Sequence, residues 1–103
     1  MDTTPKKRLE IVIEAPVLDR LCRRLDQLKV SGYTVMPAVS GRGKNGSWSR
    51  KGEISESQRM FVLFAVLDDK DLPPVLDEVY ALVSSQIGIV TVSNVEVIRA
   101  DHF

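Results

Sequence analysis

The chain has 103 residues, of which 44% are hydrophobic and 27% are charged, and its 14 basic residues balance 14 acidic ones. This composition is typical of one globular domain and is far from that of a disordered chain. A net charge of zero argues against a general nucleic-acid-binding protein, which would need an excess of basic residues.

Membrane and secretory classes are also disfavoured. No apolar run approaches the roughly 20 residues that span a bilayer, and the first residues lack the apolar core of a signal peptide. A single cysteine, Cys22, excludes an intrachain disulfide. We therefore expect a cytoplasmic protein with no inserted membrane segment.

The first part of the chain predicts a strand, a helix and a second strand. Residues 8–14 alternate with period two, as in a strand. Pro16 suits the first turn of a helix, and Gly32 is expected to end the segment that follows this helix. Residues 33–39 favour a strand, but Pro37 cannot donate a ladder hydrogen bond, which predicts a sheet edge or a bulge. The apolar stripe of the helix consists of Leu18, Leu21, Cys22, Leu25 and Leu28.

The second part repeats this order. Residues 60–67 are all apolar and predict a central strand covered on both faces. Three aspartates before Pro73 predict a helix N-cap, and Gly88 is expected to end that helix. Residues 89–99 predict a last strand, with a bulge or bend at Ser93-Asn94 where the apolar parity shifts. The second helical stripe consists of Leu72, Leu76, Val79, Tyr80, Val83 and Ile87.

This order of elements predicts an α+β fold, the ferredoxin-like βαββαβ sandwich. It has a four-stranded antiparallel sheet with two helices on one face. The doubly apolar central strand implies that the other sheet face is also covered. Copies of the same chain are the simplest cover, so we expect an oligomer.

The segment 40–58 is long, polar and rich in glycine, and such loops are usually functional or disordered. Gly41, Gly43 and Gly46 let backbone N–H groups point inward together, and Arg42 and Lys44 add positive charge. This pattern suits a nest for a phosphate or carboxylate. A solvated hairpin loop is the alternative.

We find no catalytic constellation in the sequence. His102 is next to the last residue, and Cys22 lies on an apolar helical stripe, where an inert thiol is expected. The aspartates at 68, 69 and 71 are explained by capping and solvation. Phe61 and Phe64 have opposite parity, so they cannot form one platform for stacking RNA bases. We therefore expect a protein that is not an enzyme.

Three stretches, "SGYTVMPAVSGRG", "RMFVLFAVLDD" and "SSQIGIVTVSNVEVIR", make the chain resemble the PII-like signal-transduction proteins over nearly its whole length. The resemblance implies one PII-like domain over residues 1–103, with a mobile T-loop at about 40–58. It also implies a homotrimer that binds an adenine nucleotide in clefts between subunits.

The resemblance further implies two sets of binding residues and no metal site. The nucleotide would be held by Thr34, Gly41, Arg42, Gly43, Lys44, Arg59, Ala65, Ile87, Gly88 and Arg99. Bicarbonate would be held by Gly41, Arg42, Gly43, Lys44, Asn45 and Arg59.

The chain departs from ordinary PII proteins at the B-loop. Where they have a Gly-rich segment with an Asp and a Lys that cradle a triphosphate, this chain has "SSQIGIV", which favours ADP or AMP over ATP. The tyrosine and glutamine used in nitrogen signalling have no clear counterpart. The chain is more similar to the carboxysome-associated PII-like proteins. This implies a sensor of ADP or AMP with bicarbonate, a transporter or carboxysome component as partner, and the cytoplasm or carboxysome as location.

Two alternatives remain open. A metal-linked regulator of the divalent-cation-tolerance type would use His102 with acidic residues. A small enzyme of the acylphosphatase type would need an arginine in a glycine-rich loop after the first strand, where only Arg20 is available and no glycine accompanies it.

Overall fold

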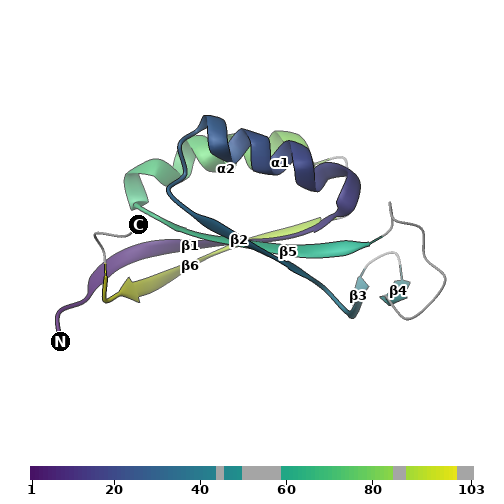
Figure 1. Cartoon of the computed structure of the whole chain (residues 1–103), viewed down its shortest axis with the longest axis horizontal. Coiled ribbons are helices and arrows are strands. Elements are labelled where there is room, and N and C mark those ends of the chain that lie inside the picture. Colours follow the sequence, from purple (N-terminus) through teal and green to yellow (C-terminus); the bar gives the residue numbers. More distant parts are fainter. Residues whose placement is uncertain (44–45, 50–58, 85–87, 100–103) are drawn as a thin grey trace.

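The computed structural model describes residues 1–43, 46–49, 59–84 and 88–99. A four-stranded antiparallel sheet of order β2-β5-β1-β6 carries both helices on one face (Figure 1). This confirms the predicted ferredoxin-like sandwich. The elements are β1 (Thr4–Glu14), α1 (Ala15–Gln27), β2 (Tyr33–Pro37), β3 (Ser40–Gly43), β4 (Gly46–Ser49), β5 (Met60–Leu67), the 3₁₀ helix η2 (Asp69–Asp71), α2 (Leu72–Val83) and β6 (Gly88–Val97).

The core lies between the helices and one face of the sheet. Leu9 pairs with Ala65 and Ile11 pairs with Leu63, so alternate residues of β1 and β5 point toward the helices. The helices meet them with stripes that recur every three or four residues. The side chains that are essentially inaccessible to water are Leu9, Ile11, Ile13, Val17, Leu21, Leu25, Leu63, Ala65, Val75 and Val79.

Among the described residues, no helix lies on the opposite face of the sheet, which we call the open face (Figure 1). On β5 it bears Val62, Phe64 and Val66, which are half-buried in the single chain. β5 is a central strand, as predicted, and β2 with Pro37 is an edge strand, also as predicted. The predicted bulge at Ser93-Asn94 is wrong, because β6 pairs with β1 residue for residue from Gly88 to Val97.

Helix α1 ends in a motif that the sequence analysis did not predict. Lys29, not Gly32, has the positive φ of 60° that follows the helix. The Lys29 N–H donates to the Asp26 carbonyl at 3.1 Å, and the Val30 N–H donates to the Leu25 carbonyl at 3.1 Å. This is a Schellman motif, which usually has glycine at the left-handed position.

Helix α2 also corrects two predictions. It ends at Val83 rather than at Gly88, which begins β6, and Tyr80 is 72% exposed rather than part of the buried stripe. Asp71 occupies the N-cap position but makes no side-chain capping hydrogen bond. The prolines of the first turn hold the helix start, because they pre-set φ and need no N–H partner there.

The 40–58 segment contains secondary structure that the sequence did not suggest. β3 and β4 pair as antiparallel strands, with Gly41 opposite Trp48 and Arg42 opposite Ser47. This small sheet lies beyond one end of the main sheet, away from the N-terminus (Figure 1). Residues 44–45 and 50–58 of the segment lie outside the described part of the chain.

Candidate functional site

The two ends of the 40–58 segment are held together at one end of the main sheet. The Ala38 N–H donates to the Met60 carbonyl at 3.0 Å, which extends the pairing of β2 with β5 by one step. The Ala15 N–H donates to the Arg59 carbonyl at 2.9 Å and ties the returning chain to the start of α1. Arg59 is half-buried here, and Arg42 is exposed on β3.

Gly88 lies at this same end of the sheet. It pairs with Ile13, next to the pairing of Glu14 with Met60. A Cβ atom on Gly88 would lie 2.9 Å from the backbone oxygen of Val12. The close approach of β6 to β1 therefore requires glycine at this position. The structure thus brings Arg59 and Gly88 of the predicted site to one end, together with the base of the 40–58 segment.

Arg99 lies at the other end. Arg99 is two residues after Val97, which pairs with Thr4 at the opposite end of β1. Strand β1 is 11 residues long. At the usual rise of a strand, about 30 Å separates the two ends of β1. Arg59 and Arg99 of one chain are therefore too far apart to contact the same small molecule.

Thr34 and Ala65 lie on opposite faces of the sheet. Thr34 is exposed and pairs with Phe64, on the open face. Ala65 is 1% exposed and belongs to the core, so its side chain lines no surface of the single chain. Of the other predicted site residues, Lys44, Asn45 and Ile87 lie outside the described residues, and Gly41 and Gly43 lie on β3.

Sequence reasoning missed a charged cluster on the open face. Arg8 Nη1 lies 3.2 Å from Glu10 Oε1, and its guanidinium carbon lies 4.8 Å from the centre of the Phe64 ring. Phe64 pairs with both Glu10 and Thr34, so this cluster adjoins Thr34 across the sheet. The signal was available, because Lys6, Arg8 and Glu10 share one parity on a strand whose other parity is apolar.

A second polar group lies between α1 and β2. The Tyr33 hydroxyl donates to Asp26 Oδ1 at 3.1 Å. Loss of hydration and this hydrogen bond raise the pKa of Tyr33 to about 12. Burial raises the pKa of the half-buried Cys22 thiol, an effect that its hydrogen bond with Tyr33 partly offsets. A raised pKa keeps Cys22 a thiol at neutral pH, which disfavours a nucleophilic role.

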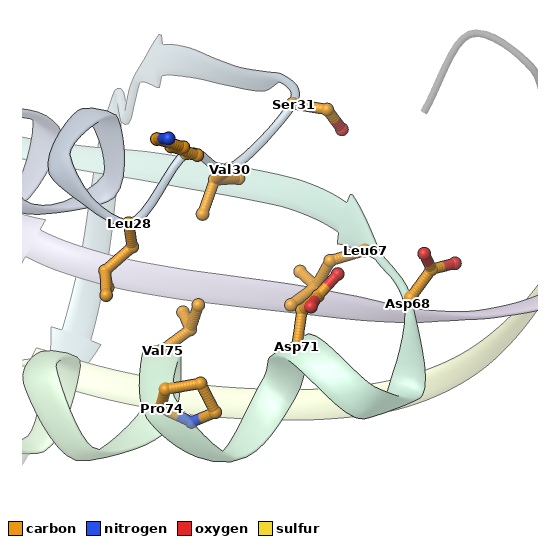
Figure 2. A pocket seen from close by; sticks show the side chains of 9 residues that line it. Leu28, Val30, Ser31, Leu67, Asp68, Asp71, Pro74 and Val75 are labelled. Carbon is orange, nitrogen blue, oxygen red and sulfur yellow. The ribbon is translucent and has the colours of Figure 1, made fainter.

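A hollow of about 250 Å³ lies between the end of α1 and the start of α2, at the end of the sheet far from the 40–58 segment (Figure 2). Two carboxylates, Asp68 and Asp71, and one ammonium group, that of Lys29, line it. Lys6 pairs with Asp68, and this hydrogen bond lowers the pKa of the Asp68 carboxyl. The carboxylates would repel a phosphate, so this hollow does not suit a nucleotide.

The described residues offer no metal site, since none of them form a group of three or more His, Cys, Asp or Glu side chains that could hold an ion. No helix in the described ranges is both long and apolar enough to cross a membrane.

Comparison with known proteins gives a consistent family. The sequence profile of the family described as nitrogen regulatory protein P-II matches residues 6–102. No curated protein sequence matches the chain.

Several solved structures share the fold. CPII, a nitrogen regulatory PII-like protein from Thiomonas intermedia K12 bound to ADP, AMP and bicarbonate, has a TM-score of 0.89 and 25% identity, over 99% of this chain and 96% of that one. A Thermus thermophilus protein assigned to PII-like signalling has a TM-score of 0.80 and 25% identity, over 100% and 99% of the two chains. A DUF3240 family protein from Shewanella baltica has a TM-score of 0.66 and 12% identity, over 89% of each chain, and shows the shared fold alone.

Proposed function

Because this chain belongs to the nitrogen regulatory protein P-II family, we propose that it is a non-enzymatic sensor of an adenine nucleotide. The nucleotide is ADP or AMP in preference to ATP, and bicarbonate is a second ligand. Binding takes place in clefts between the copies of a homotrimer. The 40–58 segment then signals to a protein partner in inorganic-carbon metabolism, such as a transporter or a carboxysome component.

The observation that carries this proposal is the separation of Arg59 and Arg99. They lie at opposite ends of β1, about 30 Å apart at the rise of a strand. The resemblance assigns both to the nucleotide site, and an adenine nucleotide is too short to reach both on a single chain. Two copies arranged head to tail would supply Arg59 and Arg99 to the same ligand, which supports a site between subunits.

The ligands are proposed from the similarity to a solved structure and from the positive charge of Arg42 and Arg59. The Thiomonas intermedia protein was solved with ADP, AMP and bicarbonate, and its TM-score of 0.89 supports the same ligand classes here. Arg42 and Arg59 lie near the base of the 40–58 segment, where guanidinium groups can make charge-assisted hydrogen bonds to phosphate and bicarbonate oxygens. Exposed Thr34 offers a hydroxyl for the edge of a base.

Signalling requires that ligand binding change the 40–58 segment. In the described part of the structure, β3 follows β2 after Ala38 and Val39 and pairs with β4 in a sheet separate from the main one. A ligand held by Arg42 and Arg59 would contact both the segment and its base. A differential affinity of a few kcal/mol between two arrangements of the segment is enough for a switch.

Calorimetric titration with AMP, ADP, ATP and cyclic AMP, each with and without bicarbonate, tests the proposal directly. We expect ADP or AMP to bind more tightly than ATP, and bicarbonate to increase that affinity. Absence of binding by every adenine nucleotide to a confirmed trimer would refute the sensor. Tighter binding of ATP would refute the assigned preference.

Subunit complementation tests the location of the site. Arg59→Ala and Arg99→Ala homotrimers should each lose most of their nucleotide affinity. When the two variants are unfolded, mixed in equal amounts and refolded, random assembly in a head-to-tail ring restores about one site in four. A site built from one chain would gain nothing from mixing, so unchanged weak binding in the mixture contradicts the proposal.

A further inference from the structure

A basic groove lies on the helix layer, between the outer surfaces of α1 and α2. Four residues of α1 and one of α2 line it: Arg20, Arg23, Arg24, Gln27 and Leu82. Its volume is about 370 Å³. The α1 residues recur at spacings of three and four, so their side chains share one helical face. Three guanidinium groups are thus gathered on one open surface, in a chain whose net charge is zero.

The groove's charge is only partly balanced. Arg24 Nε lies 3.8 Å from Glu78 Oε2, and both side chains are about half exposed. Within the described parts of the chain, Arg20 and Arg23 form no salt bridge. Arg20 and Arg24 are like charges four residues apart, an arrangement that weakens a helix. These arginines therefore make no evident contribution to the stability of the fold.

The groove faces away from the sheet. Both helices cover one face of the sheet, and the open face lies on the other side (Figure 1). Association of copies through the open face would leave the groove accessible. None of the residues that line the groove belongs to the predicted nucleotide site, although Leu82 is next to Val83, which lies beside Gly88 at the base of the 40–58 segment.

The side chains that line the groove indicate which kind of ligand it binds. Guanidinium groups bind carboxylates through paired N–H donors. The groove has no aromatic ring among its described lining residues on which a base could stack, and half-buried Leu82 adds an apolar contact that a bare anion would not need. The Glu78 carboxylate beside Arg24 is an example of such a pair within the chain itself.

We infer that this groove docks an acidic segment of a protein partner, with Arg20 and Arg23 binding its carboxylates and Leu82 contacting an apolar side chain. This surface is separate from the proposed nucleotide site, so either can fail without the other.

The test uses the full chain and a fluorescein-labelled octapeptide of glutamate and leucine, followed by fluorescence anisotropy at low salt. We expect the double variant Arg20→Gln, Arg23→Gln to bind the peptide at least tenfold more weakly. Its thermal stability should stay equal or rise, because a like-charge pair is removed. The matched control is Lys29→Gln, Lys70→Gln, which removes two exposed positive charges elsewhere and should change the affinity less than twofold.

Equal weakening in the two double variants would mean attraction by net charge and would overturn the inference. Absence of peptide binding, together with arginine-dependent binding to vesicles of phosphatidylserine and phosphatidylcholine, would overturn it in favour of a membrane surface. A folded double variant that keeps full peptide affinity would place the binding elsewhere.

Discussion

Gly88 is constrained by the backbone around it before any ligand is considered. A Cβ atom there would meet the carbonyl oxygen of Val12 at 2.9 Å, a contact that side chains do not tolerate, and the obstacle is backbone rather than a movable side chain. Backbone packing alone therefore explains why glycine stands at position 88, whether or not Gly88 also binds the nucleotide as proposed. A loss of binding in a Gly88 variant would have to be separated from a loss of stability.

We predict that Gly88→Ala lowers the free energy of unfolding by about 1–3 kcal/mol, because the strands must shift to relieve the overlap. Gly32→Ala is the matched control, since no atom lies within 4 Å of a Cβ at Gly32. Urea denaturation of both variants measures the effect. Equal stability of the two variants would contradict this reading of Gly88.

Single residues were the hardest features to predict from the sequence. Aspartates before a proline suggested a side-chain cap, but Asp71 makes no capping bond. Tyr80 has the spacing of the buried stripe of α2 and is exposed nevertheless. In both cases the residue type permits the predicted role, and the orientation of the whole element against the sheet decides whether it is used.

At the scale of the element, the end of α1 shows a compromise. Lys29 adopts the left-handed conformation in a Schellman motif, where a Cβ atom crowds the backbone. The motif persists because Val30 is carried toward the core, where it packs on the buried cluster. Glycine is the usual residue at this position, and nothing in the local sequence marks Lys29 for it.

We predict that Lys29→Gly raises the free energy of unfolding by about 1 kcal/mol, because glycine adopts a positive φ without strain. Lys29→Ala separates this effect from the loss of the lysine charge, and it should leave stability nearly unchanged because alanine keeps a Cβ atom. Denaturant titration of the three proteins provides the comparison. A gain in Lys29→Ala equal to that in Lys29→Gly would attribute the gain to charge instead.

The strands show where sequence patterns hold and where they do not. Pro37 placed β2 at an edge correctly, because a missing N–H is a physical constraint on pairing. The predicted bulge failed because β6 is also an edge strand, and several of its apolar side chains, such as Ile89 and Val92, stay exposed. When little of a strand is buried, its pattern of apolar residues does not reliably indicate which side chains face the core.

At the scale of the molecule, the two faces of β5 have different roles. Leu63 is fully buried under the helices, whereas its neighbour Val62 is half-buried on the open face and pairs with Val12 and Met36. The fold accounts for the first face. The proposed homotrimer accounts for the second.

We predict that Val62→Lys leaves a folded chain that no longer forms a trimer, because the charge is introduced where copies would meet. Leu63→Lys should unfold the domain, since an unpaired charge would enter the core. Circular dichroism and light scattering after size-exclusion chromatography distinguish the two outcomes. A trimeric Val62→Lys variant would show that the open face is not the contact between copies.

The sequence predicted the fold better than the site. Periodicity and proline positions are local, and they were sufficient for the order of the strands and the layer of helices. The site depends on where distant segments meet, and a single chain brings Arg59 and Gly88 together but leaves Arg99 at the far end of β1. In the proposed homotrimer a second chain completes the site, and the sequence pattern of one chain does not show how two chains meet.

The position of β1 also determines when the sheet can be finished. β1 lies between β5 and β6, and its pairing with β6 joins Thr4 to Val97, nearly the whole chain apart. Chains are synthesised from the N-terminus, and distant pairings form slowly because a long loop must close first. One edge of β1 therefore waits without a partner until β6 (Gly88–Val97) has been made. During synthesis, this bare edge is where the protein is most exposed to pairing with the wrong chain.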